Sequence, residues 1–86
     1  MFNLKVAVNN LEYNFGGATA QECLDKINLK FVEVKTKAIL TLSKGEKSID
    51  YFFTGKMLRL LIQIPNRKKH WAKVLEAHLE AGKSVV

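Results

Sequence analysis

The chain has 86 residues, of which 48% are hydrophobic and 26% charged, with 14 Lys and Arg against 8 Asp and Glu. This length and composition predict one globular domain and exclude a disordered tail or a fibrous repeat. The single cysteine excludes an internal disulfide, and the longest apolar run, 57–64, is interrupted by Arg59 and Gln63 and is too short to span a membrane. We therefore expect a small soluble protein of the cytoplasm, a reducing compartment, without a signal peptide or a membrane segment.

The excess positive charge is confined to one window of the sequence. Between Thr54 and Lys73 there are six basic residues and no acidic one, whereas the other 66 residues hold 8 of each and have no net formal charge. A localised excess makes a positive field that attracts a polyanion or an acidic partner, while evenly spread lysines only aid solubility.

The N-terminal part of the chain predicts a β-hairpin. Apolar side chains alternate with polar ones over 2–8 and again over 11–15. Asn9-Asn10 lies between the two runs and tolerates the positive φ angles that a two-residue hairpin turn requires. Gly16-Gly17 is expected to end the second strand.

A short helix is expected next. Thr19 and Glu22 have the spacing of a capping box, in which the Thr19 hydroxyl accepts from a backbone N–H and Glu22 reaches back to the Thr19 N–H. Asn28 is expected to end this helix in a left-handed conformation. The apolar residues between them have the spacing of a helix that lies on a sheet, namely Ala20, Cys23, Leu24 and Ile27.

Two further strands are predicted between 31 and 53. Residues 31–42 alternate with a period of two, and because this run is long for a strand we expect a bulge or bend near Lys37. The segment 43–46 predicts a turn. A fourth strand is predicted by the alternation of Ile49, Tyr51 and Phe53.

Two helices are expected to follow the last strand. Thr54 can cap a helix that runs to Ile64, and the proline after it stops the helix because the residue before a proline is pushed out of helical geometry. Asn66 is then expected to cap a last helix over 67–81, which Gly82 closes.

The element order ββαββαα predicts an α+β domain. We expect a four-stranded, mostly antiparallel sheet with a β-grasp-like element order over 1–53, packed by one helix. A C-terminal helix pair over 54–82 and a tail over 83–86 complete a single domain, 1–86. Element order of this kind indicates no function by itself.

The C-terminal helix pair carries the candidate binding site. Three consecutive cations begin the last helix, where the dipole disfavours each by about 0.3–1 kcal/mol, so we expect an anion to offset that cost. Further cations lie with Gln63 on one narrow stripe of the preceding helix. We predict a small, non-catalytic nucleic-acid-binding or regulatory protein that contacts phosphates. The predicted site residues are Lys56, Arg59, Arg67, Lys68, Lys69, His70 and Lys73.

Other functions compete with nucleic-acid binding. The same basic surface can dock on an acidic protein, as in a small adaptor or inhibitor, or can be a solvated face without a partner. Both DNA and RNA fit the pattern: a basic helix start suits a helix-turn-helix, although the turn at Pro65 lacks a glycine. An RNase that uses His70 with the neighbouring lysines is the one enzyme alternative. We expect no catalytic activity.

Other residues that could carry chemistry are assigned to the core. Trp71 is expected to anchor the last helix on the sheet rather than to stack a base. His78, on the same helix face, is expected to be a partly buried, hydrogen-bonded histidine, and Cys23 an inert buried thiol. Because Cys23, His70 and His78 lack the spacing of metal ligands, neither a metal nor a cofactor is expected.

An apolar outer face of the sheet indicates a contact surface. Phe31, Ile39 and Phe52 are expected to point away from the core, so they form a homodimer interface or are covered by the last helices, and cover by the helices is the simpler expectation. The tail Lys83-Ser-Val-Val86 has a pattern that can add to the edge of a partner's sheet, or can fold back on the helix end.

Overall fold

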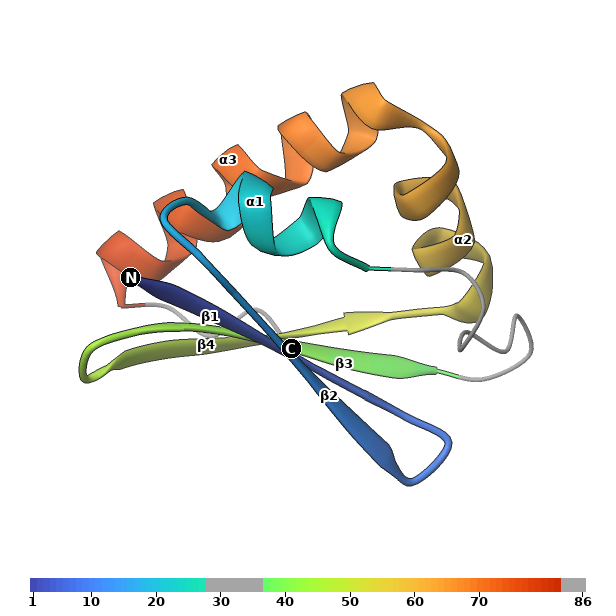
Figure 1. Ribbon diagram of the computed structural model, residues 1–86, viewed down its shortest axis with the longest axis horizontal. Coiled ribbons are helices and arrows are strands. Elements are labelled where there is room, and N and C mark those ends of the chain that lie inside the picture. The colour runs from blue at the N-terminus through green and yellow to red at the C-terminus, as the bar shows by residue number, and fades with distance from the viewer. Residues whose placement is uncertain (28–36, 83–86) are drawn as a thin grey trace.

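The computed structural model describes residues 1–27 and 37–82 of the chain. Their strands form one sheet in the order β2-β1-β3-β4, in which every pairing is antiparallel (Figure 1). The predicted α+β class and element order are confirmed. In chain order the elements are β1 Phe2–Val8, β2 Leu11–Gly17, α1 Ala20–Asp25, β3 Ala38–Lys44, β4 Lys47–Phe53, α2 Gly55–Gln63 and α3 Pro65–Ala81.

The first hairpin forms around the two asparagines, as predicted. Asn9 and Asn10 have φ angles of 54° and 63°, and a type I′ turn requires positive φ at both central residues. The β1–β2 register pairs Phe2 with Gly17, so β2 runs through the two glycines rather than ending before them.

The N-terminal cap of α1 differs from the predicted capping box in one bond. Thr19 caps the helix and accepts from the Glu22 N–H at 3.1 Å. The Glu22 carboxylate, however, accepts from the Ala18 N–H at 2.6 Å rather than from the Thr19 N–H. The carboxylate therefore accepts from the N–H of the residue before the N-cap. The Glu22 side chain is long enough to reach that N–H as well as the N–H of the cap.

Helix α1 is also shorter than its apolar stripe predicts. It ends at Asp25, with Lys26 as a right-handed C-cap whose ammonium donates to the Gly16 carbonyl. Ile27 is buried although it lies beyond the helix. Ile27 therefore fits the apolar spacing of the helix and is buried, although its backbone is not helical. Asn28, the expected end of the helix, lies outside the described residues.

Strand β3 begins later than the predicted strand. Lys37, where a bend was expected, is not in the strand, and 31–36 lie outside the described residues. Within β3, Ala38, Leu40 and Leu42 are buried on one face, as the alternation predicts. The β3–β4 ladder continues to its last pair, Lys44 and Lys47, which shortens the turn to Gly45-Glu46, with Gly45 at a φ of 62°.

A single residue, Ile64, connects α2 to α3. It is extended (φ −111°, ψ 107°), as a residue before proline must be. Pro65 takes the first position of α3, where its missing N–H is not needed, so Asn66 lies inside the helix and is not its cap. The predicted cap at Asn66 is therefore wrong. Thr54 caps α2, and Gly82 closes α3 at a φ of 69°, both as predicted.

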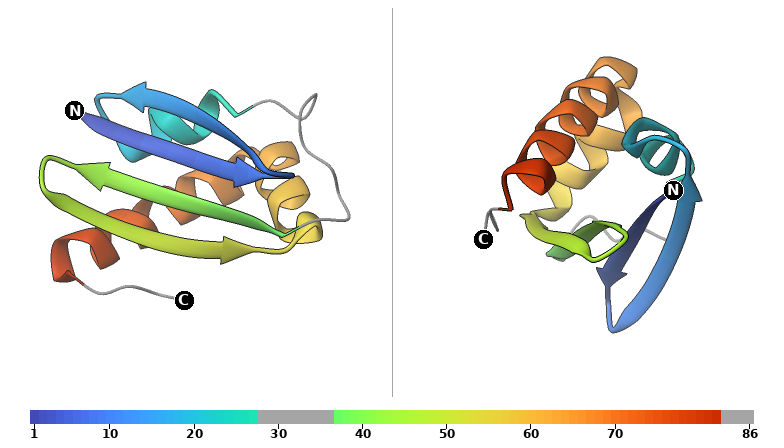
Figure 2. Two further views of the ribbon diagram at one scale, coloured as in Figure 1. Left: turned by 90° about the horizontal axis from the view of Figure 1, so that it is seen from below. Right: turned by 90° about the vertical axis from the view of Figure 1, so that its left-hand side faces the viewer.

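Helices α1 and α3 cover one face of the sheet, and α2 stands at one end of it (Figure 1). The two views of Figure 2 place α1 and α3 side by side on that face. Buried side chains of the strands and of all three helices form one core, which includes Leu4, Val6, Leu40, Leu42, Phe53, Leu58, Leu75 and Leu79.

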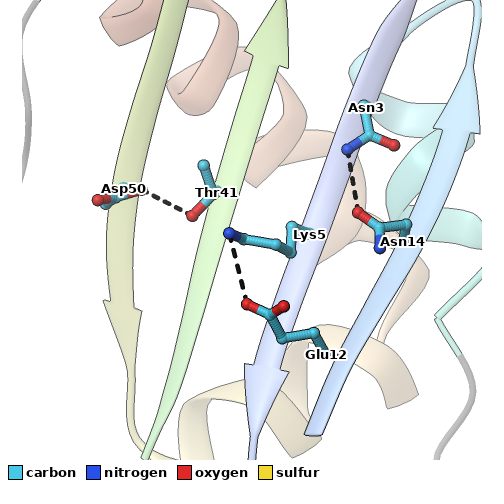
Figure 3. Close-up of polar contacts among 6 residues, drawn as sticks. All are labelled: Asn3, Lys5, Glu12, Asn14, Thr41 and Asp50. Atoms are coloured by element: carbon cyan, nitrogen blue, oxygen red, sulfur yellow. Dashed lines mark hydrogen bonds and ion pairs between the residues drawn. The ribbon is translucent and has the colours of Figure 1, made fainter.

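The opposite face of the sheet carries polar cross-strand pairs (Figure 3). Asn3 donates to Asn14 at 3.3 Å, Lys5 lies 3.5 Å from Glu12, and Thr41 donates to Asp50 at 2.6 Å. We call this the open face, because the described helices pack on the other side.

Ile39 and Phe52 lie on the open face, so the expectation that the last helices cover them is wrong. The apolar stripe of α3, with Leu75 and Leu79, completes the core beside α1 and is not free to cover the other side. Phe52 is 45% exposed and Ile39 is half-buried. Phe31, expected on the same outer face, lies outside the described residues, as does the tail 83–86.

Candidate functional site

The cations of α2 form the predicted stripe. Lys56, Arg59 and Gln63 are exposed, while Leu58 and Leu61 are buried on the other side of the helix. At 100° and about 1.5 Å per residue, the three exposed residues share an arc of about 60° along about 10 Å of the axis. This helix therefore packs by its apolar side and presents a straight line of polar side chains to solvent.

The cations of α3 do not share one face. Arg67, Lys68 and Lys69 are consecutive, so their side chains point about 100° apart around the helix. Lys68 is half-buried on the side of the core, whereas Arg67 and Lys69 are exposed on different sides. Lys73 and His70 are exposed as well, and Lys73 lies one turn from Lys69. Lys69 and Lys73 are thus the basic pair that α3 turns to solvent together.

The dipole of α3 disfavours the consecutive cations less than their sequence predicts, because the helix starts at Pro65. Because the helix begins at Pro65, only Arg67 of the three consecutive cations lies in its first turn. The dipole acts mainly within that turn, so Lys68 and Lys69 oppose it less than expected. The Arg67 N–H already donates to the Ile64 carbonyl at 3.0 Å. An anion at this site would be attracted by the charged side chains rather than by free backbone N–H groups.

Within residues 1–27 and 37–82, no ion pair involves the basic side chains of α2 and α3. The salt bridges found there join Lys5 to Glu12 at 3.5 Å and Lys47 to Glu80 at 3.3 Å. We use the term helix-pair cations for the six residues that lack a carboxylate partner in this part of the chain: Lys56, Arg59, Arg67, Lys68, Lys69 and Lys73.

The one-residue connection keeps the two basic segments together at one end of the helical layer. In Figure 1, α2 rises from the sheet and α3 begins at its top, so the start of α3 (orange) is the end of that helix farther from the sheet. The helix-pair cations therefore lie on two helices that meet at Ile64, with Lys56 at the opposite, sheet end of α2 and Lys73 about two turns into α3.

Trp71 anchors α3 on the sheet, as predicted. Its ring centroid lies 4.9 Å from that of Tyr51, in an edge-on arrangement, and 4.8 Å from that of Phe53. His70 is exposed, and its ring lies 5.9 Å from the Trp71 ring. The half-buried indole is thus occupied by core contacts.

His78 is half-buried but not hydrogen-bonded as expected. Its ring stacks on Tyr51 with centroids 6.3 Å apart and an interplanar angle of 16°. Its Nδ1 atom is buried without a hydrogen-bond partner among the described residues. The prediction of a satisfied histidine is wrong, because the stacked neighbour offers this atom a ring face and no polar group.

Cys23 is fully buried, as predicted. Its thiol donates to the Phe2 carbonyl at 3.6 Å, and burial raises the pKa of this thiol above its ordinary value. A protonated, inaccessible sulfur is a poor nucleophile and a poor metal ligand. In the part of the chain that the structure describes, no group of three or more His, Cys, Asp or Glu could hold a metal ion.

A hollow at one end of the open face was not predicted. It has a volume of about 670 Å³, and its lining includes Asn9, Asn10, Lys37, Ile39 and Phe52. The alternation of the strands indicates that Ile39 and Phe52 point outward. It does not indicate that β3 pairs with β1, which brings the asparagine turn beside them.

A smaller hollow of about 340 Å³ adjoins the first, because Lys37 and Phe52 line both. The smaller one also reaches Thr54, the N-cap of α2. We call the two together the sheet-end hollow. None of the helix-pair cations lines either part.

Comparison of the chain with protein-family models, with curated proteins and with solved structures found no match. Among the helices of the described ranges, none combines the length and the apolar character needed to cross a membrane.

Proposed function

We propose that the protein binds nucleic acid, without catalysing a reaction, through the helix-pair cations. The observation that carries this proposal is that six basic side chains lie on two consecutive helices with no acidic residue between Thr54 and Lys73 and no carboxylate partner among the described residues. Duplex DNA carries one negative charge per about 1.7 Å of its axis, so a single polymer can neutralise several of these cations at once.

The side chains suit contacts with phosphates better than recognition of a base sequence. Lys56 and Arg59 lie on a straight exposed stripe, whereas Arg67 and Lys69 point to different sides of α3. Such long, exposed cations can contact the phosphate backbone of a nucleic acid from several directions. They do not present a fixed pattern of donors and acceptors to base edges. We therefore expect binding with little sequence preference.

The spacing of the two histidines argues against a catalytic pair made of both, and it leaves His70 with the neighbouring lysines as the enzyme alternative. His70 and His78 are eight residues apart on α3, which separates them by about 12 Å along the axis. An acid and a base that act on one phosphate must both lie within hydrogen-bond reach of it. These two side chains cannot do so together.

A cytoplasmic location is part of the same proposal. The single cysteine is a free, buried thiol, which fits a reducing compartment. In that compartment, RNA, DNA and acidic proteins all compete for a basic surface. The test of function must therefore separate nucleic acid from protein partners.

The proposal is tested by comparing two double variants. One loses two positive charges from α3, and the other loses two positive charges from the β3–β4 turn. The variant Arg67→Ala/Lys69→Ala should bind labelled RNA and DNA about ten- to hundredfold more weakly at near-physiological salt, since each lost phosphate contact lowers the affinity. The control Lys44→Ala/Lys47→Ala loses the same charge at the β3–β4 turn and should bind nearly as the natural chain does. Equal losses in both variants would reject the helix pair as the site, whereas a partner captured from nuclease-treated lysate would favour an acidic protein.

A further inference from the structure

We infer that the sheet-end hollow holds an unpaired base of a single-stranded nucleic acid, with Phe52 as the surface on which the base stacks. This inference rests on the proposed function and adds the class of substrate, which is a single strand rather than a duplex. It is carried by the exposed ring, by the polar groups around it and by the position of the hollow next to α2.

Phe52 differs from the neighbouring aromatic side chains in its exposure. Phe52 is 45% exposed as a residue, whereas Phe53 is 1% exposed, and Tyr51 and Trp71 pack against each other beside the core. An aromatic side chain at the edge of a hollow offers a π face to a base. Stacking of this kind accepts every base, which agrees with binding of low sequence preference.

The polar side chains around Phe52 suit a nucleotide. Asn9 and Asn10 are exposed, and the turn fixes their backbone, so each presents an amide that can both donate and accept, as base edges require. Lys37 is exposed and lines both parts of the hollow, where it can bind a phosphate. The volume of about 670 Å³ lies within the usual range of small-ligand pockets, about 300–1,000 Å³.

Among the described residues that line the hollow, one is acidic, and its charge is compensated. Glu12 belongs to the lining, but its carboxylate lies 3.5 Å from the Lys5 ammonium (Figure 3). Lys37 has no carboxylate partner among the described residues. The balance of charge among the described lining residues is therefore positive and favours a phosphate over a carboxylate ligand.

The hollow lies at the end of the sheet where α2 begins. The exposed stripe of Lys56, Arg59 and Gln63 runs along that helix. The smaller part of the hollow reaches Thr54, and Lys56 follows two residues later, at most about 7 Å away along the backbone. Figure 1 and the left view of Figure 2 place α2 at the end of β4. A strand whose phosphates lie on Lys56 and Arg59 can therefore place a neighbouring base against Phe52.

A duplex cannot use this hollow without losing a base pair. Its bases are stacked inside the helix, and extruding one costs a few kcal/mol. The helix-pair cations serve single strands and duplexes alike, whereas the hollow adds affinity only for unpaired nucleotides. Single-stranded RNA and DNA should therefore bind more tightly than duplex DNA of equal charge.

The test measures the affinity of two Phe52 variants for three labelled polymers. These are a ten-nucleotide RNA, the single-stranded DNA of the same sequence and a DNA duplex. Phe52→Leu keeps an apolar side chain without a ring and should weaken binding of both single strands about five- to hundredfold, with the duplex unaffected. Phe52→Tyr keeps the ring and should retain the affinity. Phe15→Leu makes the same change at a partly buried ring outside the hollow and is the matched control.

Each result decides between named alternatives. Unchanged single-strand affinity in Phe52→Leu, with weakened binding in Arg67→Ala/Lys69→Ala, would overturn this inference and leave the proposed function standing. No binding by the natural chain would reject both. If the natural chain sediments as a dimer and Phe52→Leu as a monomer of unchanged affinity, the exposed ring belongs to a contact between copies of the chain. This result would also overturn the inference. If Phe52→Leu does not fold, amide shifts of the natural chain on titration with the RNA take its place: shifts at Asn9, Asn10 and Ile39 support the inference, and their absence rejects it.

Discussion

Ile39 and Phe52 are direct cross-strand neighbours in the β3–β4 ladder, on the face of the sheet opposite to α1 and α3. The next residue, Phe53, pairs with Ala38 and points into the core. Two adjacent phenylalanines thus lie on opposite faces of one strand, as the period of two in a strand requires. Only Phe53 belongs to the buried core.

The two phenylalanines should differ in their contribution to stability. Phe53→Ala empties a fully buried site and should lower the free energy of unfolding by about 3–5 kcal/mol. Phe52→Ala removes a cross-strand contact with Ile39 and should cost less than about 1 kcal/mol. Denaturant unfolding of both variants measures the difference. Equal losses would mean that Phe52 is covered in solution.

Gly17 should tolerate a methyl group much less well than Gly16. A Cβ at Gly17 would lie 2.8 Å from the Glu22 Cβ and 3.2 Å from backbone atoms at the start of α1, whereas a Cβ at Gly16 would meet nothing closer than 3.9 Å. We expect Gly17→Ala to lower the free energy of unfolding by about 1–3 kcal/mol through this clash. The matched variant Gly16→Ala should be neutral or stabilise by up to about 1 kcal/mol. A milder effect at Gly17 than at Gly16 would contradict the close packing of β2 on α1.

The buried thiol should make stability depend on alkaline pH. Burial raises the pKa of Cys23 in the folded chain, so the unfolded chain releases its thiol proton first as the pH rises. The stabilisation from Cys23 is complete below the ordinary thiol pKa of about 8.5 and is lost as the pH rises through the folded value. Urea unfolding at pH 7 and pH 9.5 should show a larger loss in the natural chain than in Cys23→Val. Parallel losses would show that the thiol ionises equally in both states.

Replacing His78 should stabilise the protein. Its Nδ1 is buried without a partner in the described part of the chain, and such a group costs about 1–3 kcal/mol. Phenylalanine keeps the stacking on Tyr51 and removes the orphan atom, so His78→Phe should raise the free energy of unfolding by about 1 kcal/mol. Thermal melting at pH 7.5 measures the effect. A lower melting temperature would indicate that the imidazole has a polar partner in solution.

The elements of the fold could be predicted because each has a local cause. The asparagine turn, the Thr19 and Thr54 caps and the final Gly82 each follow from side-chain chemistry within a few residues, and the structure contains all of them. The wrong N-cap of α3 arose where two local signals competed. At the start of α3, Asn66 is a good cap, but Pro65 suits the first helical position and determined the start.

The candidate site could be predicted only in part. The charge window identified which residues are basic, but not that Arg67, Lys68 and Lys69 point to different sides of α3. The sheet-end hollow depends on β1 pairing with β3, which joins residues more than thirty positions apart along the chain. Alternation within each strand assigns faces but does not determine which strands are neighbours.

The proposed binding of nucleic acid is tested most directly by its dependence on salt. Fluorescence anisotropy of labelled single-stranded RNA, single-stranded DNA and duplex DNA should be titrated with the natural chain between low and near-physiological salt. Contacts from four to six cations predict a log–log slope of affinity against salt of about −4 to −5 on the duplex, with micromolar or tighter binding of the single strands persisting at the higher salt. Weak binding that is equal for all three polymers and vanishes at the higher salt would contradict the proposal and leave a generic basic surface.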